Sequence, residues 1–224
     1  MSAAGAPVYR LAVLASGSGT NLQAIIDQLH GRPAGMSGPV INVALVISDN
    51  PDARVLERAR EAGIATAVFP MDHGGSRVEH DLAMAAAIRE AGAELVVLAG
   101  YMRLVSPTFV EEFPCRIINL HPALLPAFPG TTSISDAVRY GVKVTGVTVH
   151  FVDEGLDTGP VIAQEPVRVN DEDTAESLAE RIHEVEHRLL PATIRLIATG
   201  RVRTPLPGTR VVQVDWGGDD SRGT

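Results

Sequence analysis

The sequence predicts a single α/β domain built on a mostly parallel, twisted sheet with helices on both faces. Three observations lead to this prediction. Short apolar, β-branched runs alternate with longer segments of helical periodicity, which is the pattern of β-α-β units. Right-handed crossovers between parallel strands place successive helices on both faces. The 224 residues, 45% apolar and 21% charged, are enough for one sizeable hydrophobic core.

The first half of the chain supplies five predicted strands and the helices between them. The strands are expected at Arg10–Ala15, Val40–Ile47, Ala65–Phe69, Leu95–Leu98 and Arg116–Leu120. Apolar residues at helical spacing predict helices at Asn21–Leu29, Asp52–Ala62, Arg77–Ala91 and Pro107–Glu112.

After residue 121 the pattern changes from alternating strands and helices to a β-rich extension of the same sheet. A loop rich in proline and glycine comes first, and a short helix, two strands and a long helix follow it. These elements are expected at His121–Gly130, Ile134–Tyr140, Val144–Val152, Val161–Val169 and Thr174–Ile197.

The ends of the chain and one proline complete the predicted organisation. We expect a flexible N-terminus at residues 1–9, one domain at 10–204 and a C-terminal tail at 205–224, which frays from Gly217 onward. Pro191 lies inside the last helical pattern. Because proline lacks the backbone N–H of a helical hydrogen bond, it predicts a kink or break there.

Composition favours a cytoplasmic protein and excludes several classes of partner. A formal charge of −8 argues against a general binder of nucleic acid or membrane surfaces, since both select a basic face. The single cysteine, Cys115, cannot form an internal disulfide and is most simply a small core side chain. Met1–Pro7 lacks the features of a signal peptide. No run approaches the ~18 apolar residues of a membrane span.

A glycine-containing loop, Ser16–Asn21, joins the first strand to the first helix. Backbone N–H groups freed by small residues at a helix N-terminus form an anion site, and a phosphate monoester is the natural ligand. A dinucleotide is an alternative, with Asp49 as the acid on the ribose, but Leu22 occupies the third glycine position of that fingerprint. The remaining alternative is a tight turn without a ligand.

Asn119 and His121 stand two residues apart at the end of the fifth strand, so they share one face of it. In parallel open sheets, ligands collect beyond the carboxyl ends of the strands. An amide donor beside an imidazole at that edge is suited to stabilising an oxyanion and handling a proton. The alternative is that both side chains only hydrogen-bond the next loop.

An acidic, glycine-containing segment, Asp153–Pro160, follows the sixth strand. Such segments are usually solvated turns. The alternative is that one carboxylate folds back and holds His121 protonated, because an opposite charge nearby raises the pKa of a histidine.

Taken together, the motifs resemble the folate-dependent phosphoribosylglycinamide formyltransferases of purine synthesis. The resemblance covers roughly residues 10 to 200 and is far more specific than any single motif. The matching segments are Leu14–Ile25, Val97–Arg103, Asn119–Pro126, His150–Val152 and Leu156–Val161.

The resemblance implies a Rossmann-like formyltransferase fold and two small-molecule substrates. The formyl donor is 10-formyltetrahydrofolate, the acceptor is the amine of 5-phosphoribosylglycinamide, and no metal is needed. The matching positions assign catalysis to Asn119, His121 and Asp157.

The resemblance also implies residues for both ligands. Gly19, Thr20 and Asn21 match the positions that bind the acceptor phosphate. His183 and Glu186 match the positions that contact its ribose and glycinamide side. The folate-facing positions are Arg77, Met102, Arg103, Leu104, Val105, Asn119, Asp153, Glu154, Gly155 and Leu156. The alternatives for these positions are core packing at a strand end for Met102, Leu104 and Val105, and a solvated helix start for Arg77.

The chain departs from the family pattern at one position in the proline-rich loop. Two residues after Gly130 the family usually has histidine, whereas this chain has Thr132. The missing histidine makes one rival function plausible, a non-catalytic relative that binds phosphoribosyl or folate ligands. A second rival is a formyl-folate hydrolase, in which water replaces the amine, and the phosphate loop argues against it. The protein is expected to be a monomer or a homodimer.

A competing motif is His183–His187, which matches the zinc-protease pattern His-Glu-x-x-His on a helix. The predicted buried stripe of that helix contains Leu178, Ile182, Val185 and Leu189, and His187 lies nearly opposite it. Catalytic zinc also needs a third protein ligand, and no histidine or glutamate follows His187.

Overall fold

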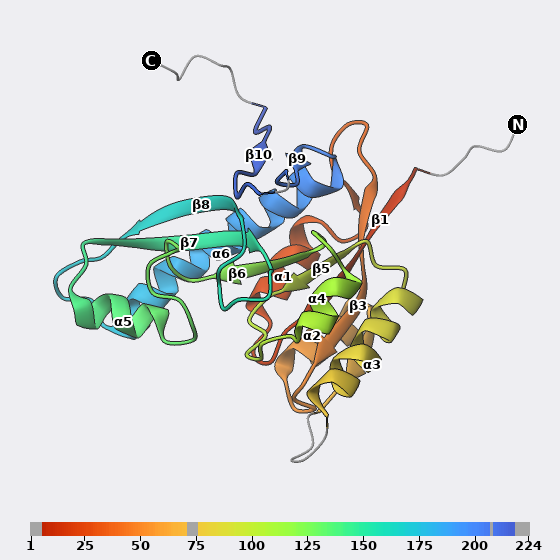
Figure 1. The fold of residues 1–224 in the computed structure, drawn as a ribbon, viewed down its shortest axis with the longest axis horizontal. Coiled ribbons are helices and arrows are strands. Elements are labelled where there is room, and N and C mark those ends of the chain that lie inside the picture. Colours follow the sequence, from red (N-terminus) through yellow and green to blue (C-terminus); the bar gives the residue numbers. More distant parts are fainter. Residues whose placement is uncertain (1–5, 71–75, 207, 218–224) are drawn as a thin grey trace, which may run out of the picture.

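The structure is a computed structural model that describes residues 6–70, 76–206 and 208–217. Ten strands and six helices follow one another along the described chain (Figure 1). The strands are β1 (Val8–Leu14), β2 (Arg32–Pro33), β3 (Val40–Ser48), β4 (Ala65–Val68), β5 (Leu95–Leu98), β6 (Ile117–His121), β7 (Val144–Phe151), β8 (Val161–Arg168), β9 (Val202–Arg203) and β10 (Gln213–Val214). The helices are α1 (Thr20–Gln28), α2 (Arg54–Glu61), α3 (Arg77–Glu90), α4 (Pro107–Glu112), α5 (Ser133–Tyr140) and α6 (Ala175–Ala198).

The central sheet has the order β2-β3-β1-β5-β6-β7-β8, with β4 paired to β3 on a separate branch. The pairs β4–β3, β3–β1, β1–β5 and β5–β6 are parallel, whereas β6–β7 and β7–β8 are antiparallel. The predicted mostly parallel sheet with a β-rich extension is therefore confirmed. The end of β7 lies beside the start of β6, because Phe151 pairs with Ile118, so the loop after β7 must fold back to reach the residues at the end of β6.

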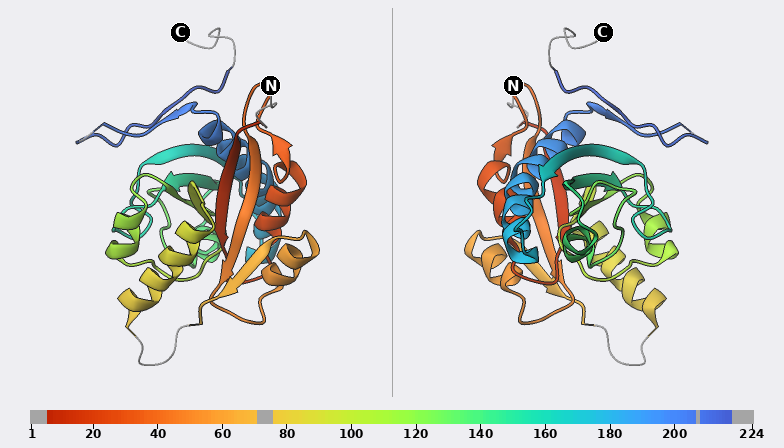
Figure 2. Two further views of the ribbon diagram at one scale, coloured as in Figure 1. Left: turned by 90° about the vertical axis from the view of Figure 1, so that its right-hand side faces the viewer. Right: turned by 90° about the vertical axis from the view of Figure 1, so that its left-hand side faces the viewer.

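Two hydrophobic cores lie on opposite faces of this sheet. Helices α1, α2 and α6 cover one face, and α3 and α4 cover the other (Figure 2). Along β1, Leu11 and Val13 belong to the first core, while Ala12 and Leu14 belong to the second. A strand that is buried on both faces has a continuous apolar sequence. The apolar run of β1 therefore predicts this strand from the sequence alone.

The predicted ends of the chain need correction. β1 begins at Val8, within the segment expected to be flexible, because Val8 and Tyr9 already pair with Val40 and Ile41 of β3. Within the predicted tail, β10 pairs antiparallel with β9. The fraying expected beyond Gly217 lies outside the described residues.

Cys115 is exposed and not a core side chain as predicted. It occupies the turn between α4 and β6 with a left-handed φ of 54°. The exposed turn therefore keeps this small apolar side chain out of the core, although free cysteines are usually buried.

Helix α6 runs through Pro191 without a break, so of the predicted kink or break the break is wrong. Proline at position 191 leaves the carbonyl of His187 without its helical N–H partner. Gln28, at the end of α1, donates its Nε2–H to that carbonyl at 2.8 Å. A side chain from the neighbouring helix thus replaces the missing backbone donor.

We expect Gln28→Ala to lower the free energy of unfolding by about 0.5–1 kcal/mol, the usual net contribution of one hydrogen bond. Chemical denaturation measures the loss. In a Pro191→Ala background, the restored backbone N–H supplies the donor, so the loss from Gln28→Ala should be smaller. Equal losses in both backgrounds would show that Gln28 does not replace the proline's missing bond.

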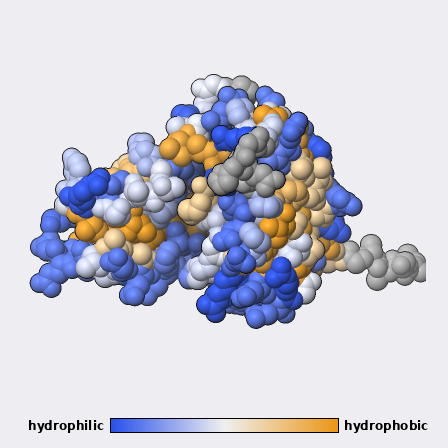
Figure 3. Space-filling model, turned by 90° about the horizontal axis from the view of Figure 1, so that it is seen from below, coloured by the Kyte–Doolittle hydropathy of each residue, from blue (hydrophilic) through white to orange (hydrophobic). Residues whose placement is uncertain are grey.

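No helix among residues 6–70, 76–206 and 208–217 has the length and apolarity needed to cross a membrane. Seen from below, hydrophilic side chains cover the outer parts of the surface, and apolar ones appear in separate patches (Figure 3).

Candidate active site

A pocket of about 290 Å³ opens at the carboxyl ends of β5 and β6, between the loops that follow β5, β6 and β7. It is lined by all the predicted folate-facing residues and by the three predicted catalytic residues. These are Arg77, Met102, Arg103, Leu104, Val105, Asn119, His121, Asp153, Glu154, Gly155, Leu156 and Asp157. The structure thus brings together residues from segments up to 80 positions apart in the chain.

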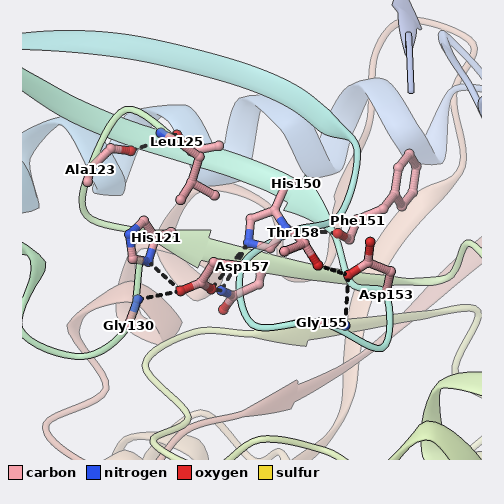
Figure 4. A network of polar contacts seen from close by, with 12 residues as sticks. His121, Ala123, Leu125, Gly130, His150, Phe151, Asp153, Gly155, Asp157 and Thr158 are labelled. Carbon is pink, nitrogen blue, oxygen red and sulfur yellow. Dashed lines mark hydrogen bonds and ion pairs between the residues drawn. The ribbon is translucent and has the colours of Figure 1, made fainter. Parts of the chain in front are cut away.

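Asp157 contacts both Asn119 and His121, and all three residues line this pocket. Figure 4 shows the Asp157 carboxylate beside His121 and Gly130. Its Oδ2 is 3.4 Å from Nδ1 of His121 and accepts the backbone N–H of Gly130 at 2.7 Å. Its Oδ1 accepts an N–H of the Asn119 amide at 3.3 Å. A carboxylate of the acidic loop thus folds back onto His121, as in the alternative to a solvated turn.

The state expected for His121 requires correction. Burial is the largest effect and lowers the pKa of His121 below its ordinary value, although Asp157 and the carbonyl of Phe128 oppose it. The Nε2 atom lies 2.8 Å from that carbonyl, and Nδ1 lies 3.4 Å from Oδ2 of Asp157, so each ring nitrogen faces an oxygen acceptor. The nearby carboxylate nevertheless does not outweigh the effect of burial on the pKa of this imidazole.

Asp157 itself remains ionised. Burial is the largest single effect and would raise the pKa of its carboxyl, but hydrogen bonds from His150 and the Gly130 backbone and the electrostatic effect of His121 lower the pKa overall. The site therefore holds a negative charge beside the imidazole of His121.

His150 of β7 orients the Asn119 amide. Its Nδ1 lies 2.8 Å from the carbonyl of Phe151, and its Nε2 lies 3.7 Å from Oδ1 of Asp157. The Asn119 Nδ2 lies 3.2 Å from that Nε2. The Asn119 amide nitrogen is thus held by His150 and Asp157 at long distances, and a ligand oxygen can replace either contact.

Two residues that the sequence did not single out anchor the loop after β6. Thr148 is fully buried; its hydroxyl donates to the carbonyl of Ala123 at 2.6 Å and accepts the N–H of Leu125 at 3.1 Å. Gln164 of β8 donates to the carbonyl of Leu125 at 2.9 Å. In the sequence, the only sign of this role was that each of the two residues is a polar residue within a predicted strand.

The glycine loop ends at Gly19, which caps α1 with a left-handed φ of 72°. No side chain caps this helix, so the first N–H groups of α1 remain available to an anion. A Cβ atom at Gly19 would lie 2.7 Å from Val55 of α2. Glycine is therefore required at this position for two reasons: the left-handed backbone conformation, and the lack of room for a side chain beside Val55.

The predicted acceptor residues form a second cluster where α1 packs against α6. Asn21 donates to Oε2 of Glu186 at 3.0 Å, and Nδ1 of His183 lies 2.9 Å from the same oxygen. This hydrogen bond raises the pKa of His183. Glu186 is 4% exposed, and the Oδ1 of Asn21 is buried without a hydrogen-bond partner among the described residues.

The acceptor and pocket clusters are adjacent, because the charge of Glu186 also acts on the pKa of His121. The predicted acceptor residues nevertheless do not line the pocket; they are Gly19, Thr20, Asn21, His183 and Glu186. The arrangement provides two neighbouring subsites, and the imidazole of His121 belongs to the pocket.

The zinc-protease interpretation receives no support from the geometry. His183 is turned to Glu186, and the His183 and His187 rings are stacked with centroids 6.3 Å apart. The described ranges contain no group of three or more histidine, cysteine, aspartate or glutamate residues arranged to hold a metal ion.

The two arginines of the pocket are held in place by the protein. Arg77 donates to the carbonyl of Leu104, and Arg103 donates through Nε to Oδ2 of Asp49 at 2.8 Å. Asp49, the candidate ribose acid of the dinucleotide alternative, is thus paired with a pocket arginine.

Thr132, at the departure from the family pattern, stands exposed at the start of α5. Its hydroxyl donates to Oδ2 of Asp136 at 2.7 Å, and Arg139 pairs with the other oxygen at 2.6 Å. The position therefore belongs to a polar network on α5.

Comparison with known proteins agrees with this geometry. Residues 9–194 match the formyl transferase family, and a phosphoribosylglycinamide formyltransferase of Bacillus subtilis is 41% identical over 83% of this chain and 93% of its own length. The chain belongs to the phosphoribosylglycinamide formyltransferase family. A Mycobacterium tuberculosis member is 44% identical over 90% of the chain and 93% of its own length. The crystal structure of glycinamide ribonucleotide transformylase 1 from Symbiobacterium toebii superimposes with a TM-score of 0.85 at 47% identity, covering 92% of this chain and 94% of that one.

Proposed function

We propose that the protein transfers the formyl group of 10-formyltetrahydrofolate to the amine of 5-phosphoribosylglycinamide in purine biosynthesis. The observation that carries the proposal is the pairing of two neighbouring subsites. One is a pocket ending in Asn119, His121 and Asp157; the other is an uncapped helix N-terminus beside Asn21 and Glu186. Family membership supplies the identities of the two ligands.

The folate occupies the pocket and the acceptor occupies the α1 end. The folate is surrounded by three parts of the pocket lining, which are Arg77, Met102–Val105 and Asp153–Leu156. Gly19, Thr20 and Asn21 receive the acceptor phosphate, because backbone N–H groups at a helix N-terminus favour an anion. His183 and Glu186 lie toward the ribose and glycinamide.

The reaction is direct transfer through a tetrahedral oxyanion. The acceptor amine attacks the formyl carbon, and the Asn119 amide donates to the developing oxyanion. Neutral His121 accepts the proton released by the amine, Asp157 stabilises the resulting imidazolium, and the ring returns the proton to the departing folate nitrogen, directly or through water. No step calls for a metal ion.

We further propose a cytoplasmic protein whose partners are small molecules, with neither nucleic acid nor membrane among them. It acts as a monomer or a homodimer, and the domain at residues 10–204 carries the activity.

One assay tests this function against its rivals. Consumption of 10-formyltetrahydrofolate is followed with and without 5-phosphoribosylglycinamide. The proposal requires consumption only with the acceptor, and one formylated acceptor per folate consumed. Consumption without the acceptor would identify a formyl-folate hydrolase. Binding of both ligands without turnover would identify a non-catalytic relative.

Thr132→His is expected to leave kcat within about twofold, as is usual for an exposed substitution away from the reacting groups. The reason is that Thr132 already has a hydrogen-bond partner in Asp136. Steady-state kinetics measure kcat for Thr132→His and for Thr132→Val. The valine variant loses the hydroxyl without gaining a ring, so the comparison distinguishes the two effects. A large gain in kcat with histidine would show that this chain lacks a group that its catalysis needs.

A further inference from the structure

The loop that carries Asp157 holds it in an unusual backbone conformation. Asp157 has a φ of 53°, in the left-handed region. This conformation costs a non-glycine residue roughly 1–2 kcal/mol unless its surroundings impose it. Something in the structure must therefore fix the loop from Asp153 to Thr158.

The hydrogen bonds inside this loop all end on one oxygen atom. Oδ1 of Asp153 accepts the backbone N–H of Gly155 at 3.1 Å and the hydroxyl of Thr158 at 2.6 Å. Within the described ranges, residues 154–158 take part in no backbone–backbone hydrogen bond. The side chains of Asp153 and Thr158 thus tie the two ends of the loop together (Figure 4).

Close packing leaves the Thr158 hydroxyl little freedom. A Cβ atom added at Gly155 would lie 2.0 Å from the Thr158 Oγ1. At the end of the loop, a Cβ atom at Gly159 would lie 1.7 Å from the carbonyl oxygen of Phe151. Glycine at both positions allows the loop to close with the hydroxyl directly over Gly155.

Asp157 is the residue next to Thr158, and its carboxylate meets three partners on β6 and on the loop that follows it. These contacts are with Asn119 at 3.3 Å, the Gly130 N–H at 2.7 Å and His121 at 3.4 Å. Hydrogen bonds weaken steeply with distance and angle, so a small movement of the loop changes all three contacts together.

We propose that Thr158 is a positioning residue, whose hydrogen bond to Asp153 closes the loop and sets where the Asp157 carboxylate meets Asn119, His121 and Gly130. The kinetic consequence rests on the proposed function, whereas the positioning of the carboxylate does not. Asp153, which lines the pocket, contributes mainly by receiving these bonds.

The matched variants are Thr158→Val, which removes the hydroxyl at nearly constant shape, and Thr158→Ser, which keeps it. Thr199→Val is the control, because the Thr199 hydroxyl bonds the carbonyl of Arg195 at the end of α6. Steady-state kinetics should show kcat reduced about three- to tenfold in Thr158→Val, the effect of one hydrogen bond. Thr158→Ser and the control should stay near the parent value.

Carbon-13 NMR titration of the Asp157 carboxyl tests the positioning without any turnover. In the parent protein, burial would raise this pKa, but hydrogen bonds from His150 and Gly130 lower it overall. Thr158→Val should shift it upward, and Thr158→Ser should not. An unchanged pKa in Thr158→Val overturns the proposal even if the parent shows formyl transfer. A parent without transfer overturns only the proposed function, since the titration still decides the role of Thr158.

A thermodynamic cycle provides a second check if Thr158→Val folds poorly. Gly155→Ala should destabilise the parent, because its Cβ atom meets the Thr158 hydroxyl, and should destabilise Thr158→Ala less. Additive losses of stability would contradict a hydroxyl held over Gly155.

Discussion

Asp157→Asn is expected to lower kcat at neutral pH by about tenfold or more, with a smaller change in KM. One unit in the pKa of His121 already corresponds to about tenfold in the stability of its charged form. The substitution keeps the shape of the side chain but removes the charge that stabilises the imidazolium. Because this charge forms on the ring only during proton transfer, the loss falls mainly on kcat.

The pH dependence follows from the groups that face His121. These are Asp157, His150, Glu186 and the carbonyl of Phe128. Asp157 raises the pKa of the ring against the larger effect of burial. Removing its charge should therefore lower the His121 pKa further, and NMR titration of His121 in both proteins measures the change. If that pKa does not fall, Asp157 is a structural or ligand-contacting residue and not the partner of His121.

Two further variants complete the experiment. His121→Asn should reduce kcat by about 100-fold or more, the usual range for a lost general acid or base. The double variant should be little worse than His121→Asn alone, because residues that act as one unit are strongly non-additive. Asp171→Asn, at an exposed carboxylate paired with Lys143, is the matched control.

The strands and helices could be predicted because their residues carry the signal locally. β5 and α4 have the predicted bounds, and the other main elements differ by at most two residues at either end. Apolar runs buried on both faces of a parallel sheet are unambiguous. Strands of two residues, such as β2 and β9, were missed because two residues carry no periodicity.

The chemistry of the site was less predictable because it depends on distance and burial. Spacing places Asn119 and His121 on one face, but only the fold brings Asp157 within 3.4 Å of the imidazole. The predicted direction of the His121 pKa shift was wrong because desolvation depends on the fold and cannot be read from the sequence. The replacement of the bond lost at Pro191 by Gln28 likewise depends on how two distant helices pack.

Asn21→Asp is expected to weaken binding of the phosphorylated acceptor about 10- to 100-fold, the range for charge-assisted hydrogen bonds, with folate binding nearly unchanged. The substitution is isosteric, yet it adds a negative charge at the N-terminus of α1, where the acceptor phosphate is proposed to bind. It also replaces the N–H that Glu186 accepts at 3.0 Å with a second carboxylate. Titration calorimetry of each ligand measures the two affinities.

This charge substitution is a cleaner test of the subsite than a bulky residue at Gly19. A side chain there would meet Val55 at 2.7 Å in a left-handed conformation, and so would disturb α2 before reaching any ligand. Asn42→Asp is the control, because the Asn42 Oδ1 accepts the N–H of Gly31 and a carboxylate oxygen can accept it too. Asn21→Ala, which removes the donor without adding charge, should weaken acceptor binding less than Asn21→Asp. Equal losses for the folate and the acceptor in Asn21→Asp would show that the α1 end is not a separate phosphate subsite.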